Sequence, residues 1–330
     1  MVIEVRRKNR SLAWKVFFWY ILTGLSHSLT AQQFSNIAGA FAELNLGVRP
    51  ASMGGASSAL SNDGNAVEHN MAAAGFSRFA ALSATTTKIF GVVPATYIGA
   101  IYPYGPGVWG LSVQQVGDAL LSETTLGVGG AIRANKILPA SLARQKFVDD
   151  MAFSVTVKTR VASFGDNVDG GEDRITGGGG GFGVDLGYFF QHSEWRVGAV
   201  WKDAFGTFRW NSSANGRYSQ RIPSKLKFGM AYISRNVRVA FDLQPALHED
   251  TPVRMFTGGE TNIFWWLMIR AGWAQNLGGH VDNKIFTAGV GRYSFSWRNL
   301  RFALQTGYRR EQIADELRFA IDLFWLKPGK

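Results

Sequence analysis

Five histidines are the first side chains to test for catalysis or metal binding. They are His27, His69, His192, His248 and His280, spread over the whole chain. None shows the close, regular spacing that a metal site needs. None stands in a phrase that joins a nucleophilic serine to a histidine and an orienting carboxylate. We therefore predict that the protein is not an enzyme and that it uses no cofactor and no metal.

The acidic run DNVDGGED is the best candidate for cation binding. Its carboxylates Asp166, Asp169, Glu172 and Asp173 are ligands that suit calcium. Their spacing does not match a known calcium loop, so a solvated acidic loop is the favoured interpretation.

The glycine run Gly177–Gly181 could suggest a phosphate loop. It is followed by FGVDLGYFF, an alternating strand pattern rather than a helix whose N-terminus would meet a phosphate. We expect it to be the flexible end of a loop.

The elements that would carry such residues are strands, and the last stretch of the chain is the clearest. Apolar residues occupy every second position there, at Leu317, Phe319, Ile321, Leu323 and Trp325. Successive strand side chains point to opposite faces, so this segment has one apolar and one polar face. Segments 225–233 and 236–244 repeat the pattern across a short turn and predict a hairpin.

Counted from Ala80, such segments give about fourteen strands of the length that a tilted membrane strand requires. Short links alternate with longer polar ones, among them 165–177, 206–221 and 275–283. The link 135–150 is long at an end where short turns are expected, and we predict a short helix in it. We therefore predict an all-β fold, a single antiparallel transmembrane β-barrel. A soluble β-sandwich is the alternative, because its strands also alternate.

Tryptophans at strand ends favour the barrel. Membrane barrels carry aromatic girdles at both interfaces. We expect this position for the residues that stand near strand ends, which are Trp195, Trp210, Trp265, Trp273, Trp297 and Trp325.

The first 31 residues are typical of a secretory signal. A basic start precedes the apolar run VFFWYILTGL, and small residues end at Ala31. Removing residues 1–31 takes away five basic residues and one acidic residue, so the net charge falls from +11 to +7. The remaining basic residues are scattered through the strands, which argues against nucleic acid as a partner. The chain has 330 residues, no cysteine and a mean hydropathy of −0.03. No later run approaches the ~20 apolar residues of a spanning helix.

The segment between the signal and the first strand reads LNLGVRPASMGGASSALSNDGNAVEHNMAAAGF. It resembles the opening of the PorV/PorQ-like family, a branch of the FadL-type outer-membrane β-barrels associated with type IX secretion. The matching residues are Gly47, Arg49, Met53, Gly54, Gly55, Ala56, Asn62, Asp63, Asn65, Ala66, Asn70 and Ala72. Met71 stands where the family usually has proline. Phrases at 141–161, 222–233, 256–273 and 319–325 extend the resemblance over most of the chain.

The resemblance implies a domain plan. Residues 1–31 would be the signal peptide, 32–78 a hatch folded into the lumen, 79–326 the barrel and 327–330 a C-terminal tail. The residues that we expect to act in the hatch or on a ligand are Arg49, Met53, Gly54, Gly55, Asp63, Asn65 and Asn70. Asn62, Asp63, Asn65 and Asn70 could meet lumenal polar groups such as Arg238, Arg270, Arg301 and Arg318. A disordered periplasmic tail is the alternative.

The family implies a protein of the bacterial outer membrane that binds or shuttles exported proteins in type IX secretion. Its partners would be outer-membrane lipid, secretion cargo and translocon proteins. Two alternatives stay open: a FadL-like channel for hydrophobic small molecules, and a plugged structural barrel. Inward positions rich in charge argue against the channel for apolar solutes, which needs an apolar pocket beside the hatch.

Overall fold

The computed structural model describes residues 44–326, except 119, 144, 166–175, 248–251, 278–283, 298 and 312–313. The predicted signal peptide 1–31, the first part of the predicted hatch and the tail 327–330 therefore lie outside the described residues. So do all four residues of the candidate calcium loop, Asp166, Asp169, Glu172 and Asp173. None of the described helices is long and apolar enough to cross a membrane.

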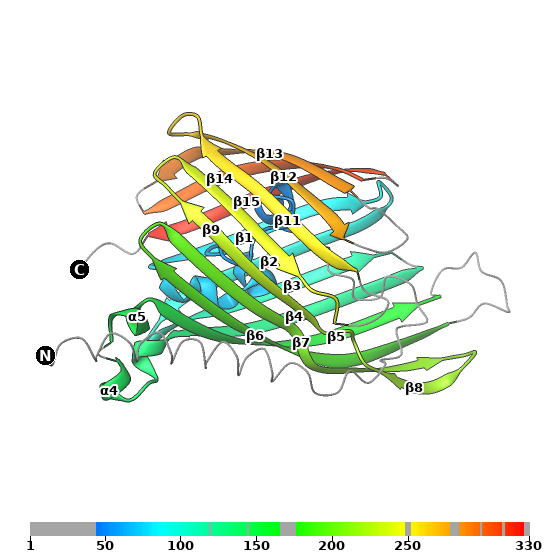
Figure 1. Ribbon diagram of the computed structural model, residues 1–330. Helices are drawn as coiled ribbons and strands as arrows, with labels where there is room; N and C mark the ends of the chain where they lie inside the picture. The colour runs from blue at the N-terminus through cyan, green and yellow to red at the C-terminus, as the bar shows by residue number, and fades with distance from the viewer. Residues whose placement is uncertain are drawn as a thin grey trace, which may run out of the picture.

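Fifteen strands make up most of the chain (Figure 1). They are β1 (Phe79–Ile89), β2 (Val93–Tyr104), β3 (Gly107–Gly117), β4 (Leu121–Arg133), β5 (Met151–Phe164), β6 (Gly177–His192), β7 (Trp195–Ser212), β8 (Gly216–Gln220), β9 (Lys225–Ile233), β10 (Val237–Gln244), β11 (Val253–Asn262), β12 (Leu267–Leu277), β13 (Lys284–Trp297), β14 (Leu300–Arg310) and β15 (Asp315–Leu326). The short helices are α2 (Val48–Ser52), α3 (Ala66–His69), η1 (Met71–Phe76), η2 (Ala134–Lys136), α4 (Ala140–Ala143) and α5 (Lys146–Asp149).

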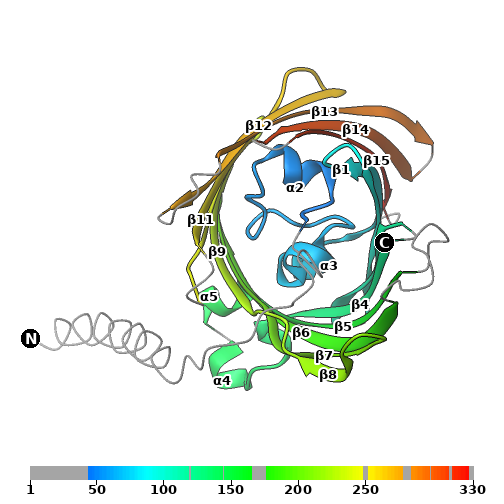
Figure 2. The same ribbon diagram turned by 90° about the vertical axis from the view of Figure 1, so that its right-hand side faces the viewer.

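The sheet closes on itself. Each barrel strand pairs antiparallel with its neighbours, β1 pairs with β15, and the ring continues from β6 to β7. Fourteen strands form this ring, and β8 pairs with the far end of β7 outside it. Figure 2 shows the ring end-on with α2 and α3 inside. The predicted all-β barrel of about fourteen strands is confirmed. Closure leaves no sheet edge, which in hydrocarbon would cost several kcal/mol per unsatisfied backbone group.

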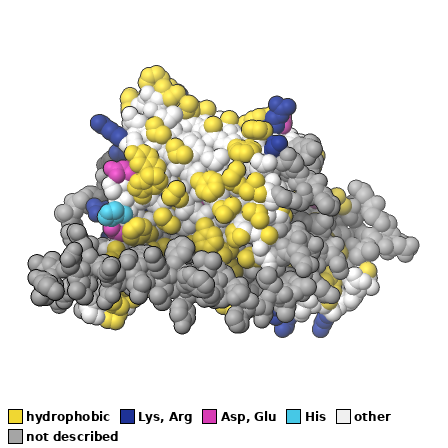
Figure 3. Space-filling view, viewed as in Figure 1, with side chains coloured by type: hydrophobic (Ala, Val, Ile, Leu, Met, Phe, Trp, Pro, Cys, Tyr) yellow, Lys and Arg dark blue, Asp and Glu magenta, His cyan; other side chains and the backbone are white. Residues whose placement is uncertain are grey.

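Alternating side chains separate an outer from an inner face. On β15 the residues Leu317, Phe319 and Ile321 are exposed, whereas Arg318 and Asp322, on the opposite face, are buried in the lumen. Apolar side chains spread over the outer wall in Figure 3, and charged ones lie toward its two ends. This is the arrangement of a wall that meets lipid outside and polar groups inside.

The two ends of the barrel differ. At one end the turns 105–106, 193–194, 234–236 and 263–266 are short; we call this the short-turn end. Links 165–176, 245–252 and 278–283 lie at the other, the long-loop end. The predicted helix in the link 134–150, at the short-turn end, is confirmed as η2, α4 and α5.

Two predicted loops are strands instead. The loop expected at 206–221 is a continuation of β7 and its hairpin partner β8, which projects from the barrel in Figure 1. The run Gly177–Gly181 is the start of β6 rather than a flexible loop end. Its missing side chains make room for Phe208 of β7, because a methyl group on Gly181 would lie 2.6 Å from the Phe208 ring. The glycines thus serve packing, which sequence reasoning did not recognise.

The tryptophans predicted to form aromatic girdles differ in their exposure. Trp195, Trp265 and Trp325 are at least half exposed, as interface residues would be. The prediction that Trp210 belongs to an aromatic girdle is wrong. It is 2 % exposed and packs inward on Phe208, with 4.5 Å between the ring centroids.

Candidate functional site

Residues 44–78 lie inside the barrel and form what we call the lumenal segment (Figure 2). It contains α2, α3 and η1, and nearly all of its residues up to Gly75 are buried. All seven sequence-predicted hatch residues belong to it. Whether the segment acts as a hatch, and whether these residues contact a ligand, stay predictions.

The backbone conformation at Gly54 and Gly55 requires glycine at both positions. Their φ angles are +67° and +93°, in the region that favours glycine. A Cβ on Gly54 would also lie 2.5 Å from the backbone nitrogen of Trp273 in the wall. The Gly54 N–H donates to Thr287 Oγ1 at 3.0 Å, and the Thr287 hydroxyl donates to Ser52 O. Met53, before the two glycines, is 1 % exposed in an apolar cluster with Phe256. The Met-Gly-Gly phrase therefore forms a tight turn against β11–β13.

A glycine belt on the barrel wall receives the lumenal segment. A methyl group on Gly110 would lie 2.6 Å from Val67 Cγ2, and one on Gly258 would lie 2.6 Å from Met53 Cα. Such contacts come from ten barrel strands, through Gly99, Gly110, Gly129, Gly187, Gly198, Gly229, Gly258, Gly272, Gly289 and Gly307. The remaining four strands reach the segment through Ser83, Ala152, Asp242 and Arg318. At the level of this belt the segment touches the wall on every strand.

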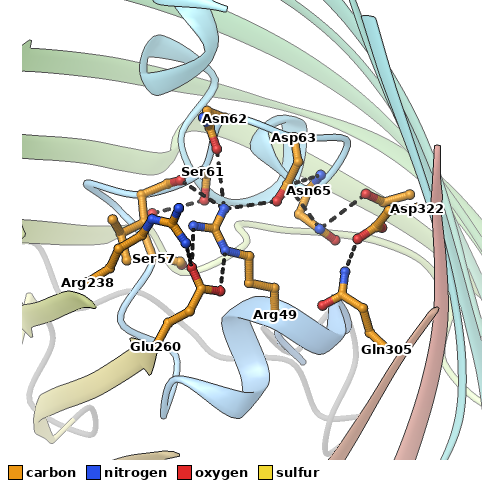
Figure 4. A network of polar contacts seen from close by, with 12 residues as sticks. Arg49, Ser57, Ser61, Asn62, Asp63, Asn65, Arg238, Glu260, Gln305 and Asp322 are labelled. Carbon is orange, nitrogen blue, oxygen red and sulfur yellow. Dashed lines mark hydrogen bonds and ion pairs between the residues drawn. The ribbon is translucent and has the colours of Figure 1, made fainter. Parts of the chain in front are cut away.

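Glu260 of β11 ties the segment to the wall on the short-turn side of the belt (Figure 4). Its carboxylate accepts from Arg49 of the segment at 3.1 Å and from Arg270 of β12 at 2.6 Å. Arg238 of β10 is a third partner. Arg49 also pairs with Asp63, with 3.1 Å between Nη1 and Oδ2. We call these five residues the Glu260 cluster. Three planar guanidinium groups hold one buried carboxylate, a strong and directional arrangement.

The predicted partners of the lumenal arginines need correction. Asp63 binds Arg49 and accepts from the Asn65 backbone and side-chain amides at 2.9 and 3.0 Å, all within the segment. Asn70 donates to Ser58 O and Tyr188 O and caps η1 by accepting from Ala72 N. Asn65 also donates to Ser83 Oγ of β1 at 3.4 Å, so Asn65 and Asn70 both meet polar groups of the wall, as predicted. The arginines named as examples are not the partners, because no hydrogen bond among the described residues joins Asp63 or these asparagines to Arg238, Arg270, Arg301 or Arg318. Arg318 instead donates to backbone oxygens of Asn45 and Leu44.

A serine–histidine pair does occur inside the segment. Ser57 Oγ lies 3.0 Å from His69 Nδ1, and both residues are buried. The nearby carboxylate of Asp242 accepts from the backbone N–H groups of Ser57 and Ser58 instead of orienting the imidazole. This geometry suits anchoring of the segment to β10 rather than acyl transfer, which needs the carboxylate on the histidine.

A second ionic cluster lies on the long-loop side of the belt. Lys158 pairs with Asp185 at 2.7 Å, and Arg160 pairs with Asp203 at 2.7 Å. Lys158 also reaches Asp203 at 3.4 Å. We call these four residues the Asp203 cluster. They come from β5, β6 and β7, where the β6–β7 register shifts between Val184 and Leu186 and Asp203 has a φ of +51°.

A cavity of 1210 Å³ extends from the Glu260 cluster to the short-turn end. Arginines and aromatic rings share its lining, among them Arg78, Arg133, Arg301, Phe79 and Phe324. Across the part of the chain that is described, no three His, Cys, Asp or Glu side chains gather closely enough to hold a metal ion.

The sequence analysis did not identify Glu260, the residue at the centre of this site. Glu260, Asp242 and Asp203 were not singled out, although each lies at an inward position of a strand. In the register of the sheet, Glu260 stands opposite Arg238 on one side and Arg270 on the other. That charge pattern was visible in principle, but only a known register turns it into a prediction.

Comparisons with known proteins find similarity in structure alone. No protein-family model matches the chain, and no curated protein sequence matches it. Among solved structures, the monoaromatic hydrocarbon channel CymD shares 13% identity, with a TM-score of 0.59 over 88% of this chain and 99% of CymD. The toluene transporter TbuX of Ralstonia pickettii shares 14% identity, with a TM-score of 0.55 over 86% of this chain and 98% of TbuX. A FadL homologue of Pseudomonas aeruginosa shares 10% identity, with a TM-score of 0.56 over 85% of this chain and 98% of the homologue.

These likenesses define the fold as that of the FadL-type outer-membrane barrels, and they place the protein in the bacterial outer membrane. The short-turn end, where β1 begins and β15 ends, is therefore the periplasmic end, and the long-loop end faces outward. Assignment to the narrower PorV/PorQ-like branch rests on the sequence phrases alone.

Proposed function

We propose that this protein is an outer-membrane channel for small hydrophobic molecules. Solved structures of similar fold include a monoaromatic hydrocarbon channel and a toluene transporter. The observation in this chain that carries the proposal is the pairing of the lumenal charges around the glycine belt.

In the sequence, the inward charges suit ions or a plugged lumen better than apolar solutes. In the structure the carboxylates of Glu260, Asp185 and Asp203 each form an ion pair with a buried arginine or lysine side chain. A charge that is paired and hydrogen-bonded inside a protein fastens one element to another and offers little to a passing ion. Apolar clusters fill the lumen between these pairs, for example Met53 packed with Phe256, and Val67 with Met71. A lumen of this kind suits an apolar solute better than the sequence indicated.

Uptake of labelled toluene tests the proposal. The protein is produced in a bacterial host that lacks channels of this type, and the host without the gene provides the baseline. We expect uptake at limiting toluene to rise several-fold. Vesicles containing the protein should show no swelling in sucrose above protein-free vesicles. Uptake equal to the baseline, with the barrel folded in the outer membrane, would contradict the proposal.

The predicted role in type IX secretion rests on the resemblance in the sequence. It makes a different prediction for the same cells. Affinity purification from the native membrane should recover cargo or translocon proteins bound to the barrel, and deletion should leave toluene uptake unchanged.

A further inference from the structure

We propose that the outward face of the β7–β8 hairpin binds phosphate groups of the lipids in the outer leaflet of the bacterial outer membrane. The face carries Arg209 and Arg217, and Arg221 follows directly after β8. We call these three residues the hairpin arginines. Lipopolysaccharide, with phosphates on its lipid A, supplies such headgroups. The inference depends on the orientation of the barrel and not on the solute that the channel passes.

The hairpin is an ordered extension of the barrel wall. β7 continues past the ring and pairs with the whole of β8. The inner face of the hairpin is apolar, because Phe208 and Trp210 are buried there and Tyr218 packs against them. The indole N–H of Trp210 donates to Gln220 Oε1 at 3.2 Å. Since the aromatic side chains occupy the inner face, the alternation of the strands turns Arg209 and Arg217 outward.

The height of the hairpin arginines above the lipid-facing wall follows from the pattern on β7. Exposed apolar side chains mark its outward face from Trp195, at the periplasmic turn, to Phe205. These residues are about 33 Å apart along the strand, or about 25 Å across the membrane at a tilt of about 40°, which matches the apolar band of such barrels. Arg209 lies about 10 Å beyond the end of this band, where a long arginine side chain reaches the lipid headgroups.

Among the described residues, the hairpin arginines have no acidic partner. All three are exposed, and none forms an ion pair with another described side chain. The sequence has no acidic residue between Asp203 and Asp242. Arg209 also stands opposite Gly180 of β6, where an added methyl group would lie 3.7 Å from its nearest neighbour. The wall beside Arg209 is therefore bare and leaves space for a phosphate.

The strand register brings two of these arginines together. Arg209 pairs with Ser219 and Asn211 pairs with Arg217, so the two arginines are diagonal neighbours on one face. Diagonal neighbours of an antiparallel pair lie about 7–8 Å apart. Two guanidinium groups at this spacing can donate to the same phosphate, and arginine favours bidentate binding of phosphate oxygens.

A lipid suits this face better than a soluble anion. The arginines continue the lipid-facing side of the wall, beyond exposed apolar residues such as Val161 and Phe182. A lipid makes both contacts at once, because its acyl chains pack on the apolar wall while its phosphate meets the guanidinium groups. Inorganic phosphate would make only the second contact. The hairpin projects from the outward end in Figure 1, and basic side chains lie at the lower edge of that end in Figure 3.

Protection of a single thiol tests the proposal in the purified, detergent-solubilised protein. The chain has no cysteine, so Ser219→Cys places one thiol on the outward face beside Arg209. We expect lipid A that carries its phosphates to slow labelling of this thiol by a water-soluble maleimide at least fivefold. Lipid A without phosphate should slow it less than twofold. Asn215→Cys, in the exposed turn of the hairpin, is the control thiol, and its labelling rate should not change.

Charge variants identify the groups that act. In the Ser219→Cys background, Arg209→Gln/Arg217→Gln should abolish the protection by lipid A. Lys88→Gln/Arg310→Gln is the matched control, because it removes the same charge from exposed residues at the outward ends of β1 and β14. The control should keep the full protection. Labelling without lipid should proceed at the same rate in every variant, which shows that the hairpin is intact.

The acidic link 166–173 offers the rival explanation, because it connects β5 to β6 next to β7 in the sheet order. Changing Asp166, Asp169, Glu172 and Asp173 to their amides should leave the protection by lipid A unchanged. A several-fold gain would show that this link holds the arginines, and it would overturn the inference.

Protection that persists in Arg209→Gln/Arg217→Gln would also overturn the inference, and so would equal protection by lipid A without phosphate. If millimolar inorganic phosphate or heparin slows the labelling as strongly as lipid A does, the face serves a soluble anion and the lipid proposal is wrong. None of these outcomes changes toluene uptake, so the lipid site and the channel fail separately.

Discussion

The Glu260 and Asp203 clusters lie on opposite sides of the glycine belt, and they use the same ion-pair chemistry for different purposes. The Glu260 cluster joins the lumenal segment to the wall, through a pair whose members are 211 residues apart in the chain. The Asp203 cluster joins three strands of the wall to one another at a register shift. Charged residues that look alike in the sequence therefore divide into groups that hold the segment and groups that shape the barrel.

Removing the Glu260 carboxylate should have the largest effect. Glu260→Ala leaves Arg49, Arg238 and Arg270 facing one another without their shared anion. Loss of one partner of a buried ion pair costs about 3–5 kcal/mol of unfolding free energy. Because release would expose the backbone of the lumenal segment, we expect a protease of broad specificity such as proteinase K to cleave it in the folded barrel. Protection equal to the original protein would show that the cluster does not hold the segment.

Filling the glycine belt should have the next largest effect. Gly258→Val forces a side chain into Met53 of the segment, whereas a methyl group on the adjacent Gly259 lies 3.8 Å from its nearest neighbour, Arg238 O. We expect Gly258→Val to lower the unfolding free energy by about 3 kcal/mol, the upper part of the range for overpacking. Gly259→Val is the matched control and should change it much less. Denaturant unfolding in lipid vesicles measures both, and equal effects would contradict a seated segment.

A substitution in the Asp203 cluster separates the two regions. Asp203→Ala removes a partner of Arg160 and of Lys158, but Lys158 keeps Asp185. We expect a loss of about 2 kcal/mol in unfolding free energy, as for a buried group left without one partner. Proteinase K resistance of the lumenal segment should stay unchanged. If the segment becomes sensitive, the two clusters are not independent.

The smallest effect is expected from Arg49→Lys. Lysine keeps the charge but cannot donate to both Glu260 oxygens, as Arg49 does through Nε and Nη2 at 3.1 and 3.3 Å. We expect a loss of about 1 kcal/mol in unfolding free energy, comparable to one hydrogen bond. An equal loss in Arg49→Lys and Arg49→Ala would mean that charge contributes nothing and geometry everything.

Much of the barrel could be predicted from local pattern. The alternation at Leu317, Phe319 and Ile321 identifies a strand and its lipid-facing side, since side chains of a strand alternate by geometry. The hairpin at 225–244 could be predicted for the same reason. The strand at Gly177–Gly181 and the β7–β8 extension could not be predicted in this way. Glycines and mixed polar residues are compatible with both loop and strand until a neighbouring strand pairs with them.

The candidate site was predictable in its segment but not in its contacts. Gly54, Gly55, Asp63 and Asn70 stood out through the family resemblance. The bonds of Asp63 are to near neighbours in the segment, whereas Gly54 and Asn70 also bond Thr287 and Tyr188 of the wall. Arg49 meets Glu260 only because β11 and the lumenal segment share one lumen, and no local signal encodes that meeting.

The amino-acid sequence by itself determined which face of each strand is apolar, because that depends on a two-residue period. It also placed the small residues that allow backbone to approach backbone. The tertiary structure decided which arginines share the Glu260 carboxylate, and that arginines and aromatic rings line one cavity. Those outcomes depend on strand register and barrel closure, which bring together residues that lie hundreds of positions apart.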